Sequence, residues 1–386
     1  MPSRTPAPIR AVALALAGLA LVGCGAGATP DPTTPGAPGT RPPIVVPETR
    51  ITPHGPEDVT RAFEEAQALL LRGEERQAVA AFERVVAMDP TGQAAGPSLF
   101  NLGLAHLALG DHARAATHFL DAERRFPDAP IAKPALIRAC RELAHLERWV
   151  DLEETARRLD RRTDLTVLER VESLGALGLG LVEQGRDDEA FKVIVQGRDL
   201  VEERKLGQSG PPPLELAQLS FALGEWRRRD SEKVTFQPMP PDFAARLEDR
   251  ATRLLSAQEA YTETMRSLDA HWSAMAGYRV GQLYQRLHQD VMAAPFQPKD
   301  LQQQRLFEGA MRLRYRILLE KGLAMMDGTV RLGERTGERT AWITRAREAR
   351  AQLERALADE KAALAKMPYT EQELRDALDK LKAKTP

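Results

Sequence analysis

The chain has 386 residues, 43% of them apolar and 28% charged, so it is long enough for one large core or two smaller ones. Lysine plus arginine number 54 against 55 aspartate plus glutamate, which argues against a protein that tracks nucleic-acid phosphates. With only two cysteines, the chain cannot be a disulfide scaffold, and its low aromatic content of 5% favours helices over a β-sandwich. The composition therefore predicts an all-α protein with no nucleic-acid partner.

Residues 1–23 have the pattern of a secretion signal. Two arginines without an acid precede the apolar run Ala11 to Val22, which is too short to cross a bilayer. The run ends in Leu-Val-Gly-Cys at Cys24, which resembles the lipobox of bacterial lipoproteins. The resemblance implies cleavage before Cys24, lipid on its thiol and, because Gly25 is not a retention signal, a location on the outer membrane facing the periplasm.

Residues 24–56 are rich in proline and have no apolar periodicity. Such a segment cannot bury enough apolar surface to fold, so we expect a solvated linker behind the lipid anchor. A disordered tail without a tethering role fits the same composition, and only the position behind Cys24 favours the linker.

The most informative feature of the chain is internal repetition over residues 57–206. Small residues, glycines, alanines and large apolar residues recur about every 37 positions, with a weaker third copy. The first copy has Ala66, Gly73, Ala78, Phe82 and Pro90, and the second Gly103, Gly110, Ala115, Phe119 and Pro127. The later copies have Cys140, Glu147, Leu152 and Ala156, then Gly178, Gly185, Ala190 and Ile194. Each copy predicts a helical hairpin with a glycine at its turn.

This pattern resembles the tetratricopeptide repeat, with a few extra loop residues in each unit. The resemblance implies an α-solenoid whose first helices line a concave surface for protein partners. It places these residues on that surface: Phe63, Gln67, Leu70, Phe100, Leu104, Ala108, Ile137, Arg141, His145, Glu172, Leu179 and Glu183. Packing inside the array is the competing interpretation of each position, and for Leu70, Ile137 and Leu179 the two interpretations have equal weight.

The sequence offers no motif for catalysis or for a cofactor. Cys140 occupies the place of Gly or Ala in the other copies, so we interpret it as a packing residue. No two histidines of the repeats lie four apart on one helix, so we expect no metal site. The glycines between Gly175 and Gly180 have no preceding strand, which argues against a dinucleotide loop. We therefore expect no catalytic residue, cofactor or metal.

Residues 207–386 are predicted to form a helical extension with long helices. Proline-rich breaks isolate one bridging helix, Leu214 to Lys233. An apolar stripe with intervals of three and four, which includes Tyr261, Leu268 and Val280, then predicts one long helix over 243–292. Residues 300–335 are expected to form a further helical hairpin. A charged helix opens at Trp342, and a capping box at Thr370 begins the last short helix.

Two segments carry a finer resemblance. Residues 119–132 are similar to a junction in envelope tetratricopeptide lipoproteins of the barrel-assembly and Tol-associated kinds. Residues 278–284, together with 292–295, resemble envelope lipoproteins of gliding delta-proteobacteria, which implies a motility complex. We thus expect a lipid-anchored scaffold that binds protein partners in the cell envelope. The alternative is a ligand-binding or peptidoglycan-processing protein with a pocket formed by Tyr261, Trp272, Tyr278, Trp342 and nearby arginines.

If Cys24 anchors the protein, Cys24→Ala removes the only thiol that can carry the lipid at the cleavage site. We expect the variant to accumulate as an unprocessed precursor or as soluble protein. Fractionation of membranes with a high-salt wash measures this, with wild type as the control. Mature variant protein that still fractionates with the outer membrane contradicts the assignment.

Overall fold

The computed structural model describes residues 57–208, 210, 212–295 and 300–383, and every regular element among them is helical. This confirms the predicted all-α class. The expected signal segment 1–23 and linker 24–56 lie outside the described residues, so their roles stay predictions. The chain divides into two compact units between Leu223 and Gly224, whereas the sequence predicted a boundary at residue 206.

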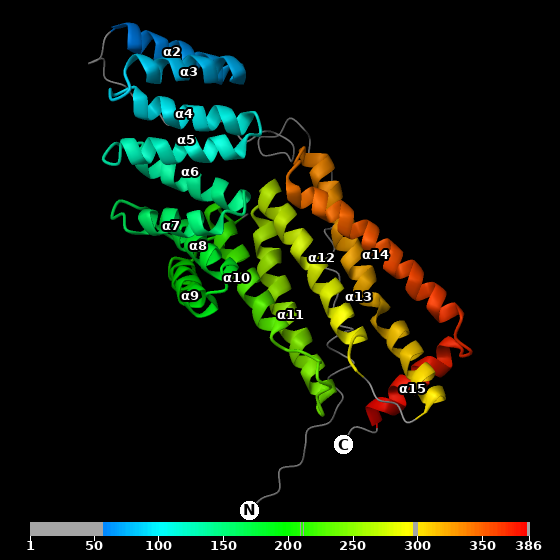
Figure 1. Cartoon of the computed structure of the whole chain (residues 1–386). Helices are drawn as coiled ribbons and strands as arrows, with labels where there is room; N and C mark the ends of the chain where they lie inside the picture. The colour runs from blue at the N-terminus through cyan, green and yellow to red at the C-terminus, as the bar shows by residue number, and fades with distance from the viewer. Residues whose placement is uncertain (1–56, 209, 211, 296–299, 384–386) are drawn as a thin grey trace, which may run out of the picture. The chain divides into compact units, whose positions relative to one another are not determined.

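The first unit is an array of antiparallel helical hairpins, and each helix packs on the next one along the chain (Figure 1). The predicted succession of helical hairpins is confirmed. The four hairpins consist of α2 (Glu57–Leu71) with α3 (Glu75–Met88), α4 (Ala95–Ala108) with α5 (His112–Arg125), α6 (Ala132–His145) with α7 (Trp149–Asp160), and α8 (Val167–Glu183) with α9 (Asp187–Glu203).

An aromatic pair forms the core of each of the first two hairpins. The rings of Phe63 and Phe82 are 5.8 Å apart between centroids, and those of Phe100 and Phe119 are 5.2 Å apart. Both members of the second pair follow their counterparts by 37 residues, so the contact repeats with the sequence period. All four side chains are at most 4% exposed.

A small residue on the first helix of each hairpin lets the second helix approach closely. A Cβ atom added to Gly103 would lie 2.4 Å from the Phe119 ring, and one added to Gly178 would lie 2.7 Å from Ile194. Cys140, at the equivalent position of the third hairpin, is fully buried. Burial is the main cause that raises the pKa of its thiol far above the ordinary value, so Cys140 is a packing residue.

The turn inside each hairpin has one conserved geometry across the four copies. In each copy, the backbone N–H of the residue after the turn donates a hydrogen bond to the carbonyl five residues earlier. The donors are Glu74, Asp111, Arg148 and Arg186. Gly73, Gly110 and Gly185 hold the left-handed position, with φ between 75° and 79°. In the third hairpin Glu147 takes this position with φ of 57°. The weakest sequence copy therefore keeps the turn although it lacks the glycine.

Helix α8 shows why the sequence has three glycines between residues 175 and 180. A Cβ on Gly175 would lie 2.6 Å from the backbone nitrogen of Leu219, and one on Gly180 would lie 3.0 Å from the backbone nitrogen of Glu153. Gly178 faces Ile194. Each glycine thus allows a different helix to pack against α8. The three glycines lie inside a helix, whereas the glycines of a dinucleotide-binding motif form the turn between a strand and a helix.

The second unit begins within α10 (Glu215–Glu232), whose ends lie one residue inside those predicted for the bridging helix. It continues with α11 (Phe243–Arg266), α12 (Ala270–Met292), α13 (Leu301–Thr336), α14 (Ala341–Ala365) and α15 (Glu371–Ala383). Gly277 and Gly281 bring α12 close to Thr329 and Met326 of α13. The predicted capping box at Thr370 is present, because its hydroxyl accepts from the Glu373 N–H and its own N–H donates to the Glu373 carboxylate.

The prediction of one long helix over 243–292 is wrong, because the chain turns between α11 and α12. Leu268, expected on the apolar stripe, has φ of 58° and is 76% exposed. Asp269 then caps α12 by accepting a hydrogen bond from the Trp272 N–H. The stripe on each side of the turn is buried, as Tyr261 and Val280 illustrate, so the periodicity was correct but gave no sign of the reversal.

The expected helical hairpin over 300–335 is also wrong, since α13 is one continuous helix of 36 residues. Its apolar positions Tyr315, Leu319, Met326 and Val330 are buried along its length. Gly337 ends it in the left-handed conformation with φ of 76°. Continuous packing against α12 and α14 stabilises a length that local sequence does not specify.

The space that glycine leaves on α8 gives a stability test. Gly175→Ala should lower the free energy of unfolding by about 1–3 kcal/mol, because the new methyl group meets the α10 backbone, which cannot move aside as a side chain can. Gly328→Ala is the matched control. That residue lies in α13 with open space around its Cβ position, and alanine there should add about 0.5–1 kcal/mol. Urea denaturation followed by circular dichroism measures both, and equal effects of the two substitutions contradict the assigned packing.

Candidate partner-binding surface

The structure places several predicted partner-binding residues in the core. Phe63, Phe100 and Leu104 are between 2% and 4% exposed, and Leu70 and Leu179 are at most 1% exposed. The rings of Phe63 and Phe100 pack against Phe82 and Phe119, the second members of the aromatic pairs inside their own hairpins. These five side chains therefore pack the array and are not available to a partner in this structure, which corrects their assignment to the concave surface.

Arg141 and Glu172, also predicted for this surface, bind each other. The Arg141 Nε contacts Glu172 Oε1, and its Nη2 donates to Oε2 at 2.9 Å, so the pair is bidentate. The Glu172 side chain is 4% exposed and that of Arg141 is 20% exposed. The pair joins α6 to α8, and this structural role means that neither residue is a simple contact residue.

Most of the predicted residues that remain partly exposed gather toward one edge of the array. Gln67, Ala108, His145 and Glu183 lie in the C-terminal halves of the first helices. In each antiparallel hairpin the chain reverses there, and the reversals lie along the same side of the array (Figure 1). Ile137 is partly exposed too, but it lies in the N-terminal half of α6, away from the turn. The candidate surface is thus displaced from the middle of the first helices to their ends.

Large apolar side chains are exposed along the same edge. Leu71 at the end of α2 is 67% exposed, Leu109 after α4 is 41% exposed, and Val150 at the start of α7 is 65% exposed. We call the surface formed by Leu71, Leu109, His112, His145 and Val150 the turn edge. Sequence reasoning missed Leu71, Leu109 and Val150, although their position beside the hairpin turns was a usable signal.

Two histidines and a carboxylate meet on the turn edge. His112 Nδ1 lies 2.7 Å from Glu142 Oε2, and the rings of His112 and His145 stack with centroids 3.7 Å apart. One ligand atom of each residue lies within 4.8 Å of the other two. The sequence argument against a metal site considered only pairs of histidines four residues apart on one helix. It therefore does not apply to a group whose members come from two helices.

A second pair of histidines lies between α4 and α5. The rings of His106 and His118 are parallel within 9°, with centroids 5.1 Å apart. Burial is the main cause that lowers the pKa of both rings, and the neighbouring ring lowers that of His118 further. The rings of this pair are stacked like those of His112 and His145 but lie farther apart, and His106 is buried.

In the second unit, two of the four aromatic residues predicted for a pocket, Tyr278 and Trp342, contact each other, and two arginines lie against Trp342. The Arg279 and Arg345 guanidinium carbons lie 5.2 Å and 4.6 Å from the centre of the Trp342 ring, and Tyr278 contacts the same ring edge-on. Trp342 is 1% exposed. Part of the set required for a pocket thus lies together, but it packs around the buried indole, whereas Tyr261 binds Glu225 and Trp272 contacts His271.

The same unit contains a buried ion cluster around Glu225. This carboxylate is fully buried, accepts a hydrogen bond from the Tyr261 hydroxyl at 2.9 Å, and lies 2.6–2.7 Å from Arg279 and Arg228. Burial, then the Glu225 charge, raises the pKa of Tyr261 well above its ordinary value. Through these ion pairs and the hydrogen bond, the cluster joins α10, α11 and α12.

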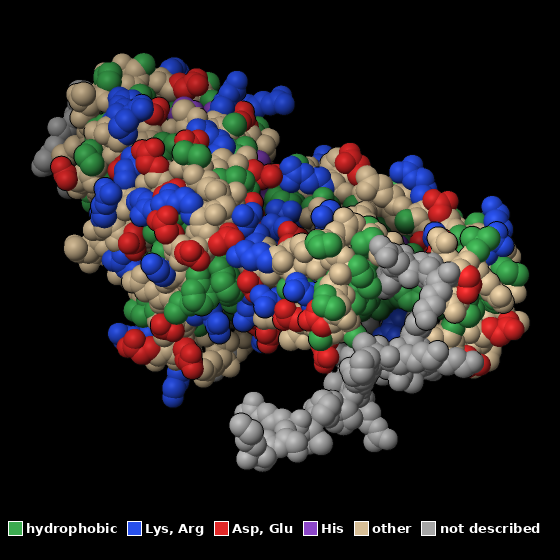
Figure 2. All heavy atoms as spheres, turned by 60° about the horizontal axis from the view of Figure 1, so that its bottom comes forward, with side chains coloured by type: hydrophobic (Ala, Val, Ile, Leu, Met, Phe, Trp, Pro, Cys, Tyr) green, Lys and Arg blue, Asp and Glu red, His purple; other side chains and the backbone are tan. Residues whose placement is uncertain are grey.

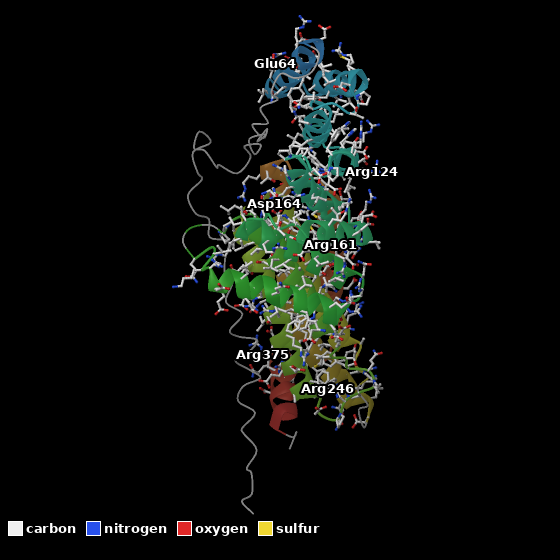
Figure 3. All side chains as sticks on the ribbon, turned by 90° about the vertical axis from the view of Figure 1, so that its left-hand side faces the viewer. Glu64, Arg124, Arg161, Asp164, Arg246 and Arg375 are labelled. Atoms are coloured by element: carbon white, nitrogen blue, oxygen red, sulfur yellow. The ribbon has the colours of Figure 1, made fainter. Side chains whose placement is uncertain are left out.

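The outer surface carries mixed charge. Positive and negative side chains are interspersed on the face drawn in Figure 2. Glu64, Arg124 and Arg161, which are labelled in Figure 3, are exposed. None of the described helices combines the length and apolar character that a membrane crossing requires.

The described fold is that of an all-α protein whose first unit is a helical-hairpin array. No family model and no curated protein sequence matches the chain. A solved structure of a tetratricopeptide repeat protein from Parabacteroides merdae is similar at 11% identity and a TM-score of 0.39, covering 75% of this chain and 99% of that one. At this level the similarity adds nothing to what the helices and their contacts establish.

The link between α6 and α8 can be measured with a double-mutant cycle. Arg141→Met and Glu172→Gln should each destabilise the array, because each leaves a charged or polar partner poorly paired in a site with little solvent. The double variant should be less destabilised than the sum of the two by about 1–3 kcal/mol. Urea unfolding measures the four proteins, and additive effects would show that the pair is not coupled.

Proposed function

We propose that this protein is a non-catalytic adaptor that binds protein partners through the turn edge. The observation that carries the proposal is the row of exposed apolar side chains at successive hairpin turns, from Leu71 to Val150. Single exposed apolar residues are ordinary on protein surfaces, but a row along a rigid array is typical of an interaction site. Polar neighbours such as Gln67 and Glu183 supply a rim that hydrogen bonds to a partner can use.

We further propose that the adaptor works in the cell envelope, anchored to the outer membrane by lipid on Cys24 and facing the periplasm. The lipobox-like sequence before Cys24 and the proline-rich residues 25–56 support this location. A motility or outer-membrane assembly complex is the proposed setting, supported by the partial resemblances of residues 119–132 and 278–284. The ligand-binding alternative has less support, because Tyr278 and two arginines pack against the buried Trp342, and the Tyr261 hydroxyl is bound to Glu225.

Partner binding should depend on the apolar row. The double substitution Leu71→Ser with Leu109→Ser should release partners that crosslink to wild-type protein in intact cells, because it removes apolar surface from the centre of the proposed contact. Both side chains are exposed, so each substitution should change the free energy of unfolding by no more than about 0.5 kcal/mol. Recovery of each crosslinked partner, quantified by mass spectrometry, measures the effect.

Met88→Ser is the matched control. Met88 is 50% exposed and ends α3, on the side of the array away from the turns, so its substitution should leave partner recovery unchanged. A double variant that folds normally and keeps every partner overturns the turn edge as the binding surface. Equal losses in the double variant and the control overturn it as well, since they would show no dependence on the edge.

A further inference from the structure

Three side chains on the turn edge have the chemistry and spacing of metal ligands. His112, Glu142 and His145 each place one ligand atom within 4.8 Å of the other two. Over the described ranges, this is the one group of three or more His, Cys, Asp or Glu residues with that arrangement. We propose that His112, Glu142 and His145 bind a single Zn²⁺ ion.

The donor set selects the class of metal. Two imidazole nitrogens and one carboxylate oxygen form a ligand combination that zinc accepts readily, whereas Ca²⁺ and Mg²⁺ prefer sites made of oxygen atoms alone. Imidazole also suits Cu²⁺ and Ni²⁺, so the protein would bind these ions too when they are supplied. Zinc is the ion we assign, because the tetrahedral geometry it favours needs only three protein ligands and one further donor.

The local structure holds the three ligands in place. Glu142 and His145 are three residues apart on α6, so they lie on the same face of that helix. His112 is the first residue of α5, whose start is fixed by Asp111 accepting a hydrogen bond from the Arg114 N–H. Helices α5 and α6 pack on each other, and the hydrogen-bonded contact between His112 and Glu142 keeps both side chains turned toward the site.

Binding requires only a local adjustment. Ligand atoms of a tetrahedral zinc site with bonds of about 2.0–2.2 Å lie about 3.4 Å apart, a separation within the 4.8 Å that bounds the three ligand atoms here. The stacked rings of His112 and His145 must tilt apart, because a metal lies in the plane of each imidazole that binds it. The His112 side chain is 29% exposed and His145 is partly exposed, so both rings have room to rotate.

The site leaves one coordination position for a molecule from outside. Three protein ligands occupy three positions of a tetrahedral ion, and water takes the fourth unless another donor replaces it. The ion would also connect the second hairpin to the third, since His112 belongs to α5 and the other ligands to α6. The assignment rests on these distances and donors alone and is independent of the partner-binding proposal.

Metal binding by the purified full-length chain tests the site. After EDTA treatment and dialysis, equilibrium dialysis against Zn²⁺ with elemental analysis should give about one zinc per chain for wild type. Glu142→Gln keeps the size of the side chain and its ability to accept a hydrogen bond from His112, but removes the negative charge. This variant and His145→Gln should each bind zinc at least about tenfold more weakly, because loss of even an outer-shell contact typically costs that much.

His118→Gln is the matched control, because it removes a stacked, partly buried imidazole from α5 that lies outside the site. It should bind zinc as wild type does. Zn²⁺ should also raise the melting temperature of wild type and of this control, while Ca²⁺ at the same concentration should not. Wild type that takes up no zinc overturns the proposal and leaves the cluster as a hydrogen-bonded contact. Folded Glu142→Gln and His145→Gln variants that keep wild-type affinity overturn it too, since the zinc would then be held elsewhere.

Discussion

The array depends on one contact, made where the second helix of a hairpin places a large apolar side chain against a small residue of the first. Phe119 lies on Gly103 and Ile194 lies on Gly178, so closely that a single methyl group would collide. This contact sets the distance between the two helices. The aromatic pairs, the buried alanines and the hydrogen bonds of the turns all require that distance, and so does the stacking of one hairpin on the next.

Much of the fold could be predicted because its signals are local. Three such signals are the phenylalanine that recurs at positions 82 and 119, the turn glycines and the capping box at Thr370. Each acts over a few residues, and all are present in the structure. The break at Leu268 and the full length of α13 could not be predicted. A periodic stripe records which side of a helix is buried, but it has the same appearance whether the chain continues straight or reverses onto itself.

The candidate surface was only partly visible in the sequence. The repeat period correctly placed Phe63 and Phe100 on the first helices, but it could not show that their rings turn inward onto the second helices. His145 was identified, whereas Glu142 and His112 were not, because their proximity arises between two helices that belong to different hairpins. The available signal was Glu142 and His145 on one face of α6, together with the position of His112 at the start of the preceding helix.

The third hairpin achieves its place in the array in a different way from its neighbours. Its turn residue Glu147 adopts a conformation that glycine takes at lower cost, and its sequence is the weakest copy. Ion pairs connect the third hairpin to the hairpins on either side. Arg158 lies 2.6 Å from Glu123 of the second hairpin. Lys133 lies 3.1 Å from Glu169 of the fourth hairpin, and Arg141 binds Glu172 of the same hairpin. In a nearest-neighbour description of the array, a turn with a conformational cost is accompanied here by interface terms that include electrostatic ones. Dissolved salt screens those ion pairs that are exposed to solvent and weakens the coupling between the hairpins that they join. Ionic strength therefore affects the cooperativity of unfolding in the middle of the array, where opening of the third hairpin would separate the hairpins on either side.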